Sequence, residues 1–459
     1  MFRKFKKIHF VGIGGIGMSG IAELLLNLKF EVTGSDLKMT ATTRNLEEKG
    51  AIVHEGHHPD NVNDSDVVVY SSAVPLDNVE LESARERNIP IIRRAEMLGE
   101  LLKLKQYSIA VAGTHGKTTT TSMVGQMMTA GDLDPTLIIG GVIKNLKSNA
   151  LLGQGEYVVA EADEFDRTFL SLTPTIALIT SIEPEHLDTY SDIDDLKSAF
   201  IQFANTVPFY GVVIACLDEP NVQDILPQIS RRVITYGLSP QADVRAMNVK
   251  FREYRSTFEI HVRKESYGEI TLRVPGEHNV KNATGAVAMG LELGVPFAEI
   301  RKGLEEFDTV NRRFEFRAEH NDVLFFDDYA HHPTEVRATL AAAKQGWDRR
   351  VVAVFQPHLY TRTRDFHGEF GKAFLQSDIL CVTEIYPARE EPIEGVTGYL
   401  IAESARRVGH KDSHYIRDKE EIASYVGDLL EPGDLLITMG AGDITKYNSK
   451  IFDYYKQRA

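Results

Sequence analysis

This chain of 459 residues has little cysteine, no long apolar run and no surplus of positive charge. It contains two cysteines, too few for a disulfide framework or a cysteine-based metal centre. No stretch approaches the roughly 18 uninterrupted apolar residues that a membrane helix needs. The first ten residues, MFRKFKKIHF, lack the pattern of a signal peptide. We therefore expect a cytoplasmic protein that has no membrane partner.

The charge balance excludes another class of partner. Lysine and arginine number 51 against 66 aspartate and glutamate, which gives a formal net charge of −15. A nucleic-acid partner is not expected, because the chain offers no basic face to a phosphate backbone. Small anionic ligands remain compatible with this charge, since a helix N-terminus, a single basic side chain or a bound Mg²⁺ ion can create a local positive site.

The repeating unit of the chain is an apolar strand, a glycine-rich or acidic turn and an amphipathic helix. This order is typical of parallel α/β folds, and the length predicts more than one domain. We predict three domains, covering residues 1–105, 106–315 and 316–459. The first and third are expected to be Rossmann-like, and the central one to be an α/β domain with a P-loop-type phosphate site. Residues 243–279 alternate as in an antiparallel meander, and a helix is expected from about Lys281.

The central region opens with a candidate phosphate loop, IAVAGTHGKTTTTSM (residues 109–123). Only two residues separate Gly113 from Gly116, whereas the general Walker A motif has four. An apolar strand still runs into a glycine turn and a helix, whose backbone N–H groups can bind phosphates. Lys117 would reach the β- and γ-phosphates of a nucleoside triphosphate, and Thr118 would bind Mg²⁺. The alternative is a Gly-Lys turn that only caps a helix.

Two acidic segments follow neighbouring strands of the same region. VVAEADEFD contains Glu161, Asp163, Glu164 and Asp166, and TSIEPEHLD contains Glu183, Glu185, His186 and Asp188. Ligands of parallel sheets gather at the carboxyl ends of strands, and a triphosphatase needs a metal-binding carboxylate there. One such segment would be read as a solvated turn. Two beside a phosphate loop favour metal-assisted phosphoryl transfer, with Glu161 nearest its strand end.

A second glycine turn lies near the start of the chain, in HFVGIGGIGMSG. Gly12, Gly14 and Gly17 fit the pattern G-x-G-x-x-G, with a strand before it and an amphipathic helix after it. Asp36 closes the next strand, about where a ribose hydroxyl would be bound. Taken alone, this turn indicates NAD. A nicotinamide cofactor, however, leaves the phosphate loop without a function.

Both turns, together with several longer motifs, resemble the Mur ligase family of ATP-dependent amide ligases that build the peptidoglycan stem peptide. The motifs are VGIGGIGMSGIAE, SSAV, IPIIRRAEML, AVAGTHGKTTTTSM, AEADEFD, IEPEHLD, GEHNVKNA, NRRFE, DDYAHHPTE, FQPHLYTRT and LLITMGAGDI. The match is closest to the branch that joins L-alanine to UDP-N-acetylmuramate. The resemblance implies that the γ-phosphoryl group of ATP moves to the muramic acid carboxylate, and that the L-alanine amine attacks the resulting acyl phosphate.

The resemblance also implies a role for individual residues. The UDP-sugar set is Gly14, Gly15, Gly17, Ser19, Asp36, Ser71, Ser72 and Ala73. The ATP set is Gly113, Thr114, His115, Gly116, Lys117, Thr118, Thr119, Asn279, Asn282, Arg313 and Asp328. Thr118, Glu161 and His186 are the implied ligands of two Mg²⁺ ions. Catalysis is implied for Lys117, His186, Arg313 and Asp328, and binding of the amino acid for Arg362 and His358.

One residue departs from the pattern. Many L-alanine-adding members read FQPHRYTRT, whereas this chain has Leu359 in place of the first arginine. Recognition of the amino acid would then depend more heavily on Arg362 or Arg364.

Three alternatives stay open at this point. The first is the recycling ligase of the same family, which attaches a whole tripeptide to UDP-N-acetylmuramate. The others are an NAD-dependent oxidoreductase and a P-loop protein that binds or hydrolyses ATP without ligase chemistry. The chain is expected to act as a monomer or a homodimer.

Overall fold

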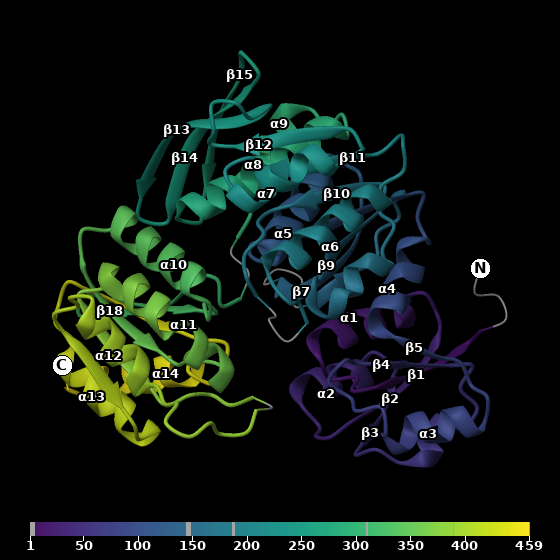
Figure 1. Ribbon diagram of the computed structural model, residues 1–459, viewed down its shortest axis with the longest axis horizontal. Helices are drawn as coiled ribbons and strands as arrows, with labels where there is room; N and C mark the ends of the chain where they lie inside the picture. Colours follow the sequence, from purple (N-terminus) through teal and green to yellow (C-terminus); the bar gives the residue numbers. More distant parts are fainter. Residues whose placement is uncertain (1–4, 144–147, 186–188, 309–310, 389, 459) are drawn as a thin grey trace. The chain divides into compact units, whose positions relative to one another are not determined.

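The computed structural model describes residues 5–143, 148–185, 189–308, 311–388 and 390–458, and it describes the side chains of all these residues except 141–143, 148 and 166. Its backbone divides into two compact units (Figure 1). The first comprises residues 1–247, 259–270 and 281–307, and the second comprises 248–258, 271–280 and 308–459. Three sheets of mainly parallel strands form the framework of the chain.

The first sheet has five parallel strands in the order β3-β2-β1-β4-β5. They are β1 (Lys7–Val11), β2 (Glu31–Asp36), β3 (Ile52–Glu55), β4 (Val67–Tyr70) and β5 (Ile91–Arg93). The connecting helices are α1 (Ile16–Asn27), α2 (Ala41–Glu48), η1 (Pro59–Val62), α3 (Val79–Glu86) and α4 (Arg94–Leu102). Each β–α step returns the chain to the same edge, so the loop after β1 and the loop after β4 both lie at the carboxyl ends of the strands.

The central sheet has ten strands in the order β15-β14-β13-β12-β11-β10-β6-β9-β7-β8. They are β6 (Tyr107–Ala112), β7 (Thr136–Ile143), β8 (Ser148–Leu151), β9 (Tyr157–Ala162), β10 (Ile176–Ile179), β11 (Val212–Cys216), β12 (Val233–Gly237), β13 (Val244–Arg252), β14 (Arg255–Val262) and β15 (Glu265–Leu272). Its helices are α5 (Lys117–Ala130), η2 (Phe165–Ser171), α6 (Ile193–Thr206), α7 (Pro220–Ile225), η3 (Leu226–Gln228), α8 (Glu277–Glu292) and α9 (Phe297–Glu305). β6 lies between β10 and β9 with parallel pairing on both sides, so the loop after β6 is flanked by the ends of both neighbours.

The first two sheets share one hydrophobic core, which explains why they form a single unit. Helix α1 contacts β7 and β8, and α4 contacts β9 and η2. Met18 and Leu98 from the first sheet's helices are 1% and 4% exposed and belong to the same buried cluster as Ile138 and Phe169 from the central domain. This packing joins the glycine turn before α1 to the region around the phosphate loop.

The third sheet has the strand order β16-β17-β21-β18-β19-β20, with β16 antiparallel to β17. Its strands are β16 (Glu315–His320), β17 (Val323–Asp328), β18 (Arg350–Phe355), β19 (Ile379–Thr383), β20 (Ser413–Ile416) and β21 (Asp434–Met439). The helices are α10 (Pro333–Gly346), α11 (Tyr360–Ala373), η4 (Phe374–Gln376), α12 (Tyr399–Arg407), η5 (Lys419–Glu421), α13 (Ile422–Leu429) and α14 (Thr445–Arg458). Separate cores lie against α10–α12 on one face and against α13 and α14 on the other, as an open α/β sheet requires.

Several expectations about local structure can be compared with these elements. The apolar stripe of α5, formed by Met123, Val124, Met127 and Met128, is fully buried. The helix expected from Lys281 begins four residues earlier, at Glu277. Edge strands β16 and β20 carry few consecutive apolar residues, and their patterns did not predict strands.

Two further observations concern features that the chain has little of. Among the described helices, none combines the length and the hydropathy that crossing a lipid bilayer would take. The two cysteines, Cys216 and Cys381, are free and buried at 1% and 0% exposure in β11 and β19.

Candidate active site

The loop between β6 and α5 has a backbone that only glycine tolerates at two points. Gly113 has φ +137° and Gly116 has φ +82°. A Cβ atom on Gly113 would lie 2.1 Å from the Thr180 hydroxyl, and one on Gly116 would lie 2.7 Å from Oδ1 of Asn282. The turn is therefore packed tightly between the end of β10 and helix α8, and its amide groups are held in a fixed arrangement.

The end of β10 fixes this loop by hydrogen bonds. The Thr114 N–H donates to the Ser181 carbonyl at 2.9 Å, and the His115 N–H donates to the Ser181 hydroxyl at 3.0 Å. The Glu183 N–H donates to the Thr114 hydroxyl at 2.9 Å, and His115 Nε2 lies 3.6 Å from a Glu183 oxygen. Thr119 follows, half-buried in the first turn of α5. The second acidic segment thus holds the phosphate loop in place through hydrogen bonds of its backbone and of Ser181.

Lys117 is the first residue of α5, and its ammonium group bends back over the loop. It donates to the Gly113 carbonyl at 2.7 Å and to both carboxylate oxygens of Glu164 at 2.7 and 3.0 Å. Glu164 is 1% exposed. Burial lowers the pKa of Lys117, but the charges of Glu164 and Asp163 outweigh burial and leave the pKa above its usual value. The lysine is therefore a firmly protonated cation.

Glu161 provides the carboxylate nearest to α5. It lies in β9, in register with Val111 of β6, and accepts hydrogen bonds from the Thr118 hydroxyl at 3.1 Å and the Gly140 N–H at 2.7 Å. Burial raises its pKa, and the contacts of Gly140, Lys117 and Thr118 oppose that rise. The oxygens of Thr118 and Glu161 converge on one point, which suits a hard cation such as Mg²⁺. His186, the other predicted ligand, lies outside the described residues.

Helix α8 carries both predicted asparagines on one face, as their spacing requires. Asn282 lies against Gly116, and Asn279 donates from Nδ2 to the Pro275 carbonyl at 2.7 Å. Both side chains are 7% exposed. They are buried polar groups inside a helix and not its cap.

The glycine turn of the first sheet is built by a different set of contacts. The Gly14 N–H donates to Asp36 Oδ2 at 2.8 Å, so this carboxylate holds the turn itself. Asn149 of β8 donates from Nδ2 to the Ile16 carbonyl at 2.5 Å and to the Ser19 hydroxyl at 3.3 Å. Ser19 is 5% exposed, and α1 begins one residue after Gly15. The predicted serine therefore faces the central domain, where it helps to anchor α1.

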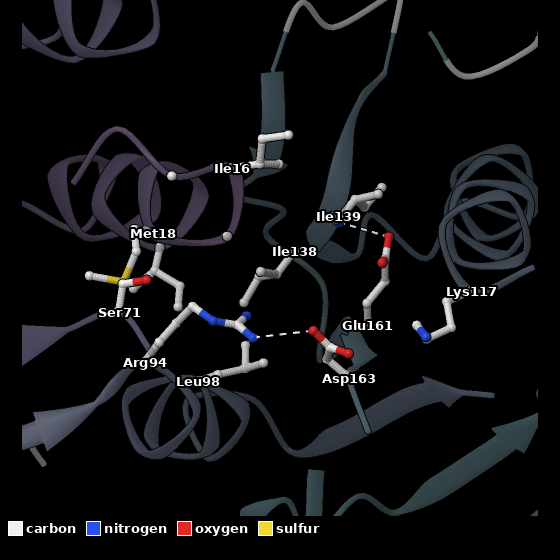
Figure 2. Close-up of a pocket in the computed structure, with 14 residues that line it drawn as sticks. Ile16, Met18, Ser71, Arg94, Leu98, Lys117, Ile138, Ile139, Glu161 and Asp163 are labelled. Atoms are coloured by element: carbon white, nitrogen blue, oxygen red, sulfur yellow. Dashed lines mark hydrogen bonds and ion pairs between the residues drawn. The ribbon is translucent and has the colours of Figure 1, made fainter. Parts of the chain in front are cut away.

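A cavity of about 350 Å³ lies between this turn and the phosphate loop (Figure 2). Its lining includes Gly15, Gly17 and Ser71 from the first sheet and Lys117 and Glu161 from the central domain. Ser72 and Ala73 follow Ser71 and are exposed. The glycine turn before α1 and Lys117 at the start of α5 thus border one space.

The second unit contains the remaining predicted residues. Asp328 ends β17 and accepts the N–H groups of Phe314 at 2.6 Å and Ala330 at 2.7 Å. Burial raises its pKa to about 6, although Arg313 and the two N–H groups act in the opposite direction. Arg313 donates to Glu335 at 3.4 Å and lies over the Tyr329 ring at 5.5 Å. Arg313 and Asp328 are therefore electrostatically coupled.

Arg362 and His358 come together at the start of α11. Arg362 Nη1 lies 3.5 Å from His358 Nδ1, and the His358 ring stacks on Tyr386 with centroids 5.8 Å apart. Leu359 lies between them with φ +72°, a left-handed conformation that a leucine rarely adopts. Such strain is common where a ligand-binding turn must keep a set direction.

Comparisons with known proteins match all three sheets. A model described as Mur ligase family, catalytic domain matches residues 7–106; the Mur ligase middle domain matches 111–290; and the Mur ligase, glutamate ligase domain matches 312–442. The chain belongs to the Mur ligase family. This Mur ligase is 52% identical to UDP-N-acetylmuramate–L-alanine ligase of Geotalea uraniireducens (strain Rf4), over 99% of each chain. It is 53% identical to the enzyme of that name from Salinibacter ruber (strain DSM 13855 / M31), over 96% of this chain and 93% of the relative.

Solved structures of Mur ligases have the same architecture. UDP-N-acetylmuramate–alanine ligase of Thermotoga maritima is 30% identical, with a TM-score of 0.83 over 99% of this chain and 100% of that one. A murein peptide ligase of Psychrobacter arcticus 273-4 is 24% identical, with a TM-score of 0.71 over 98% of both chains, and shows the shared fold. The predicted fold class, three α/β domains with Rossmann-like sheets, is confirmed.

The sequence did not single out three residues that the geometry brings to the Mur ligase site. Glu164 binds Lys117, Asn149 binds the glycine turn, and Arg94 lines the cavity. Glu164 was visible only as one of four carboxylates in a segment. Arg94 lies in the family motif IPIIRRAEML, but no spacing there distinguishes a ligand from a surface charge.

Proposed function

We propose that this Mur ligase joins L-alanine to the lactoyl carboxylate of UDP-N-acetylmuramate at the expense of ATP, in the synthesis of peptidoglycan precursors. The observation that carries the proposal is the cavity that the glycine turn before α1 shares with Lys117 and Glu161. A UDP-sugar whose diphosphate lies at the turn before α1 would extend along this cavity toward Lys117. The name shared by full-length relatives at about 50% identity supports the same substrates.

The proposed reaction overcomes a specific chemical obstacle. A free carboxylate is a poor acyl donor because its charge repels nucleophiles and its leaving group is oxide. Phosphorylation converts that oxide into phosphate, and the L-alanine amine then attacks the carbonyl carbon. Gly113–Thr119 would hold the ATP phosphates through backbone N–H groups, while Lys117 neutralises charge that develops on the transferring phosphoryl group. Positioning of both reactants supplies much of the remaining rate.

Two Mg²⁺ ions are proposed to act with ATP. Thr118 and Glu161 offer oxygen ligands 3.1 Å apart, and the half-buried Glu161 carboxylate lies where a cation would compensate its charge. His186 remains a prediction for the second ion. Bound Mg²⁺ would supply charge neutralisation at the phosphates. The lysine would stay protonated throughout, because Glu164 and Asp163 hold its pKa high.

The other assignments are proposals of the same kind. Asn279, Asn282, Arg313 and Asp328 would contact ATP. Arg362 would bind the L-alanine carboxylate with its planar guanidinium, and His358 would orient it at 3.5 Å. The domain boundaries near residues 105 and 315 also stay predictions; one falls between α4 and β6, the other at the start of β16.

The recycling ligase is the nearest alternative, and it differs in its amine substrate. It would require a site for a whole tripeptide beside Arg362. Neither an NAD-dependent oxidoreductase nor a simple P-loop ATPase accounts for the match to all three Mur ligase domains.

Phosphate release from ATP and Mg²⁺ tests the proposal. Release should require both UDP-N-acetylmuramate and L-alanine. Release that requires L-alanyl-γ-D-glutamyl-meso-diaminopimelate in place of L-alanine would assign the chain to the recycling branch. Release that is indifferent to the UDP-sugar would refute the ligase function. We also propose a cytoplasmic monomer or homodimer, and light scattering of the purified protein would distinguish the two.

A further inference from the structure

Arg94 occupies a position in the cavity that none of the assignments above uses. It is the first residue of α4, and its side chain points toward the space between the first sheet and β9 (Figure 2). A Cβ atom built on Gly17 would lie 2.9 Å from Nη1 and 3.2 Å from Cδ of Arg94. The guanidinium therefore packs directly on the backbone of the first turn of α1. Any side chain at residue 17 would displace it.

The only ion pair that the structure gives Arg94 among the described residues is long and partly solvated. Nη2 lies 3.6 Å from Asp163 Oδ2, beyond hydrogen-bonding distance, and the two side chains are 27% and 40% exposed. Pairs of this kind contribute little, about 0–1 kcal/mol. A guanidinium has five N–H donors arranged to match two oxygens of a phosphate or carboxylate. Asp163 thus holds the cation loosely, and a stronger anion can replace it.

The surroundings of Arg94 favour a phosphate over a carboxylate. The first amide groups of α1 point away from their own helix and lack an intrahelical acceptor by geometry, and Gly17 belongs to that turn. Lys117 and Glu161 lie across the cavity, toward the ATP loop. The reacting carboxylate of the sugar must reach that far side, whereas Arg94 stands against the near side.

We propose that Arg94 is a substrate-binding residue that pairs with the diphosphate of UDP-N-acetylmuramate, and that Asp163 is its counter-ion in the free protein. The inference rests on the proposed function and deepens it. Substrate binding replaces the long contact between Arg94 and Asp163 by a bidentate, charge-assisted contact between Arg94 and the diphosphate. The segment after β9 is then released from Arg94 while Glu164 still holds Lys117.

Binding measurements without catalysis test the inference. Calorimetric titrations with UDP, UDP-N-acetylmuramate and ATP would compare the wild type with Arg94→Ala, Arg94→Lys and Asp163→Asn. Arg94→Ala should weaken UDP and UDP-N-acetylmuramate by the same factor, about 10- to 100-fold, because one contact to a charged group is lost from both. Arg94→Lys should recover part of the loss. Asp163→Asn should bind UDP at least as tightly as the wild type.

The neighbouring arginine is a matched control. Arg93 is exposed, donates to the Tyr70 hydroxyl at 3.2 Å and does not line the cavity, so Arg93→Ala removes the same charge one residue away. The affinity of Arg93→Ala for UDP should change less than about twofold, as should the affinity of the Arg93 and Arg94 variants for ATP. An equal loss of UDP affinity in Arg93→Ala and Arg94→Ala would overturn the proposal, because the loss would then follow the net charge. A loss of ATP binding in Arg94→Ala would also overturn it, because it would indicate a damaged structure.

Three results separate this inference from the proposed function. If Arg94→Ala weakens UDP-N-acetylmuramate but not UDP, the guanidinium binds the carboxylate and the inference is wrong. If the wild type releases phosphate with L-alanine while Arg94→Ala binds UDP normally, the ligase function stands and only the inference fails. If the wild type binds UDP through Arg94 but releases no L-alanine-dependent phosphate, the ligase function fails and the diphosphate contact stands.

Discussion

Replacing Glu164 by glutamine should destabilise the free protein and at the same time increase its response to ATP. The pair joins a buried carboxylate to a mostly buried ammonium group, with Glu164 1% and Lys117 16% exposed and a closest approach of 2.7 Å. Removing one partner of a buried pair costs about 3–5 kcal/mol, because the other charge is left uncompensated. Lys117 keeps the carbonyl of Gly113 at 2.7 Å, so we expect the lower value, about 3 kcal/mol. Because the entropy of unfolding is about 2.1 cal/mol/K per residue, a chain of 459 residues loses about 1 °C per kcal/mol, and the melting temperature should fall by about 3 °C.

ATP should restore part of this loss, because its phosphates would bring the missing negative charge to Lys117. Thermal melts with and without saturating ATP would therefore show a larger ATP-induced shift in Glu164→Gln than in the wild type. Glu100→Gln is the control: Lys103 pairs with Glu100 at the same 2.7 Å, but the side chains are 49% and 38% exposed. Glu100→Gln should lower the free energy of unfolding by less than about 1 kcal/mol. Equal destabilisation of both variants, or identical ATP shifts in variant and wild type, would refute the reasoning.

Three other substitutions probe separate parts of the site. Glu161→Gln should lower kcat by about 100-fold and raise the Mg²⁺ concentration that gives the half-maximal rate, because the proposed Mg²⁺ ligand beside Thr118 loses its charge. Initial rates measured against Mg²⁺ concentration test this. A change in kcat alone would contradict the prediction. Leu359→Arg should lower KM for L-alanine about tenfold, because a second guanidinium would join Arg362. The φ of +72° at this residue already strains leucine. An unchanged KM would exclude binding of L-alanine by a side chain at residue 359. The pKa of Asp328 is raised to about 6 from 3.8, so the native state keeps a proton that the unfolded state has lost between these values. The wild type should therefore gain up to about 3 kcal/mol relative to Asp328→Asn as the pH falls from 7 to 4, and melting curves whose difference is independent of pH would contradict the assignment.

The positions that could be predicted from the sequence are those of residues whose placement depends on a few neighbouring residues. Lys117 and Thr118 follow a strand and a glycine turn directly, so their place at the phosphate loop depends on the six consecutive residues from Gly113 to Thr118. Glu161 was placed near its strand end from the sequence, and its register opposite Val111 brings it beside Thr118, while its role as a ligand stays a prediction. Asn279 and Asn282 needed only the period of a helix.

The residues that were missed depend on packing between distant segments. Asn149 reaches Ile16 across 133 residues, because β8 packs against α1. Arg94 contacts Gly17 only because α1 and α4 lie against the same core. Asp163 and Glu164 are adjacent in sequence yet bind different cations, from α4 and α5. No pattern in one sequence predicts which of the four carboxylates pairs with which cation.

The burial of both native cysteines makes the protein convenient for labelling. Burial raises the thiol pKa of Cys216 and of Cys381 to about 12, and thiol reagents attack the thiolate. Neither side chain should therefore react with a maleimide at neutral pH. One new cysteine in each unit, for example at the exposed Tyr210 and Tyr425, could carry a fluorophore pair in the otherwise native sequence. Energy transfer between these dyes would follow the distance between the units as each substrate is added.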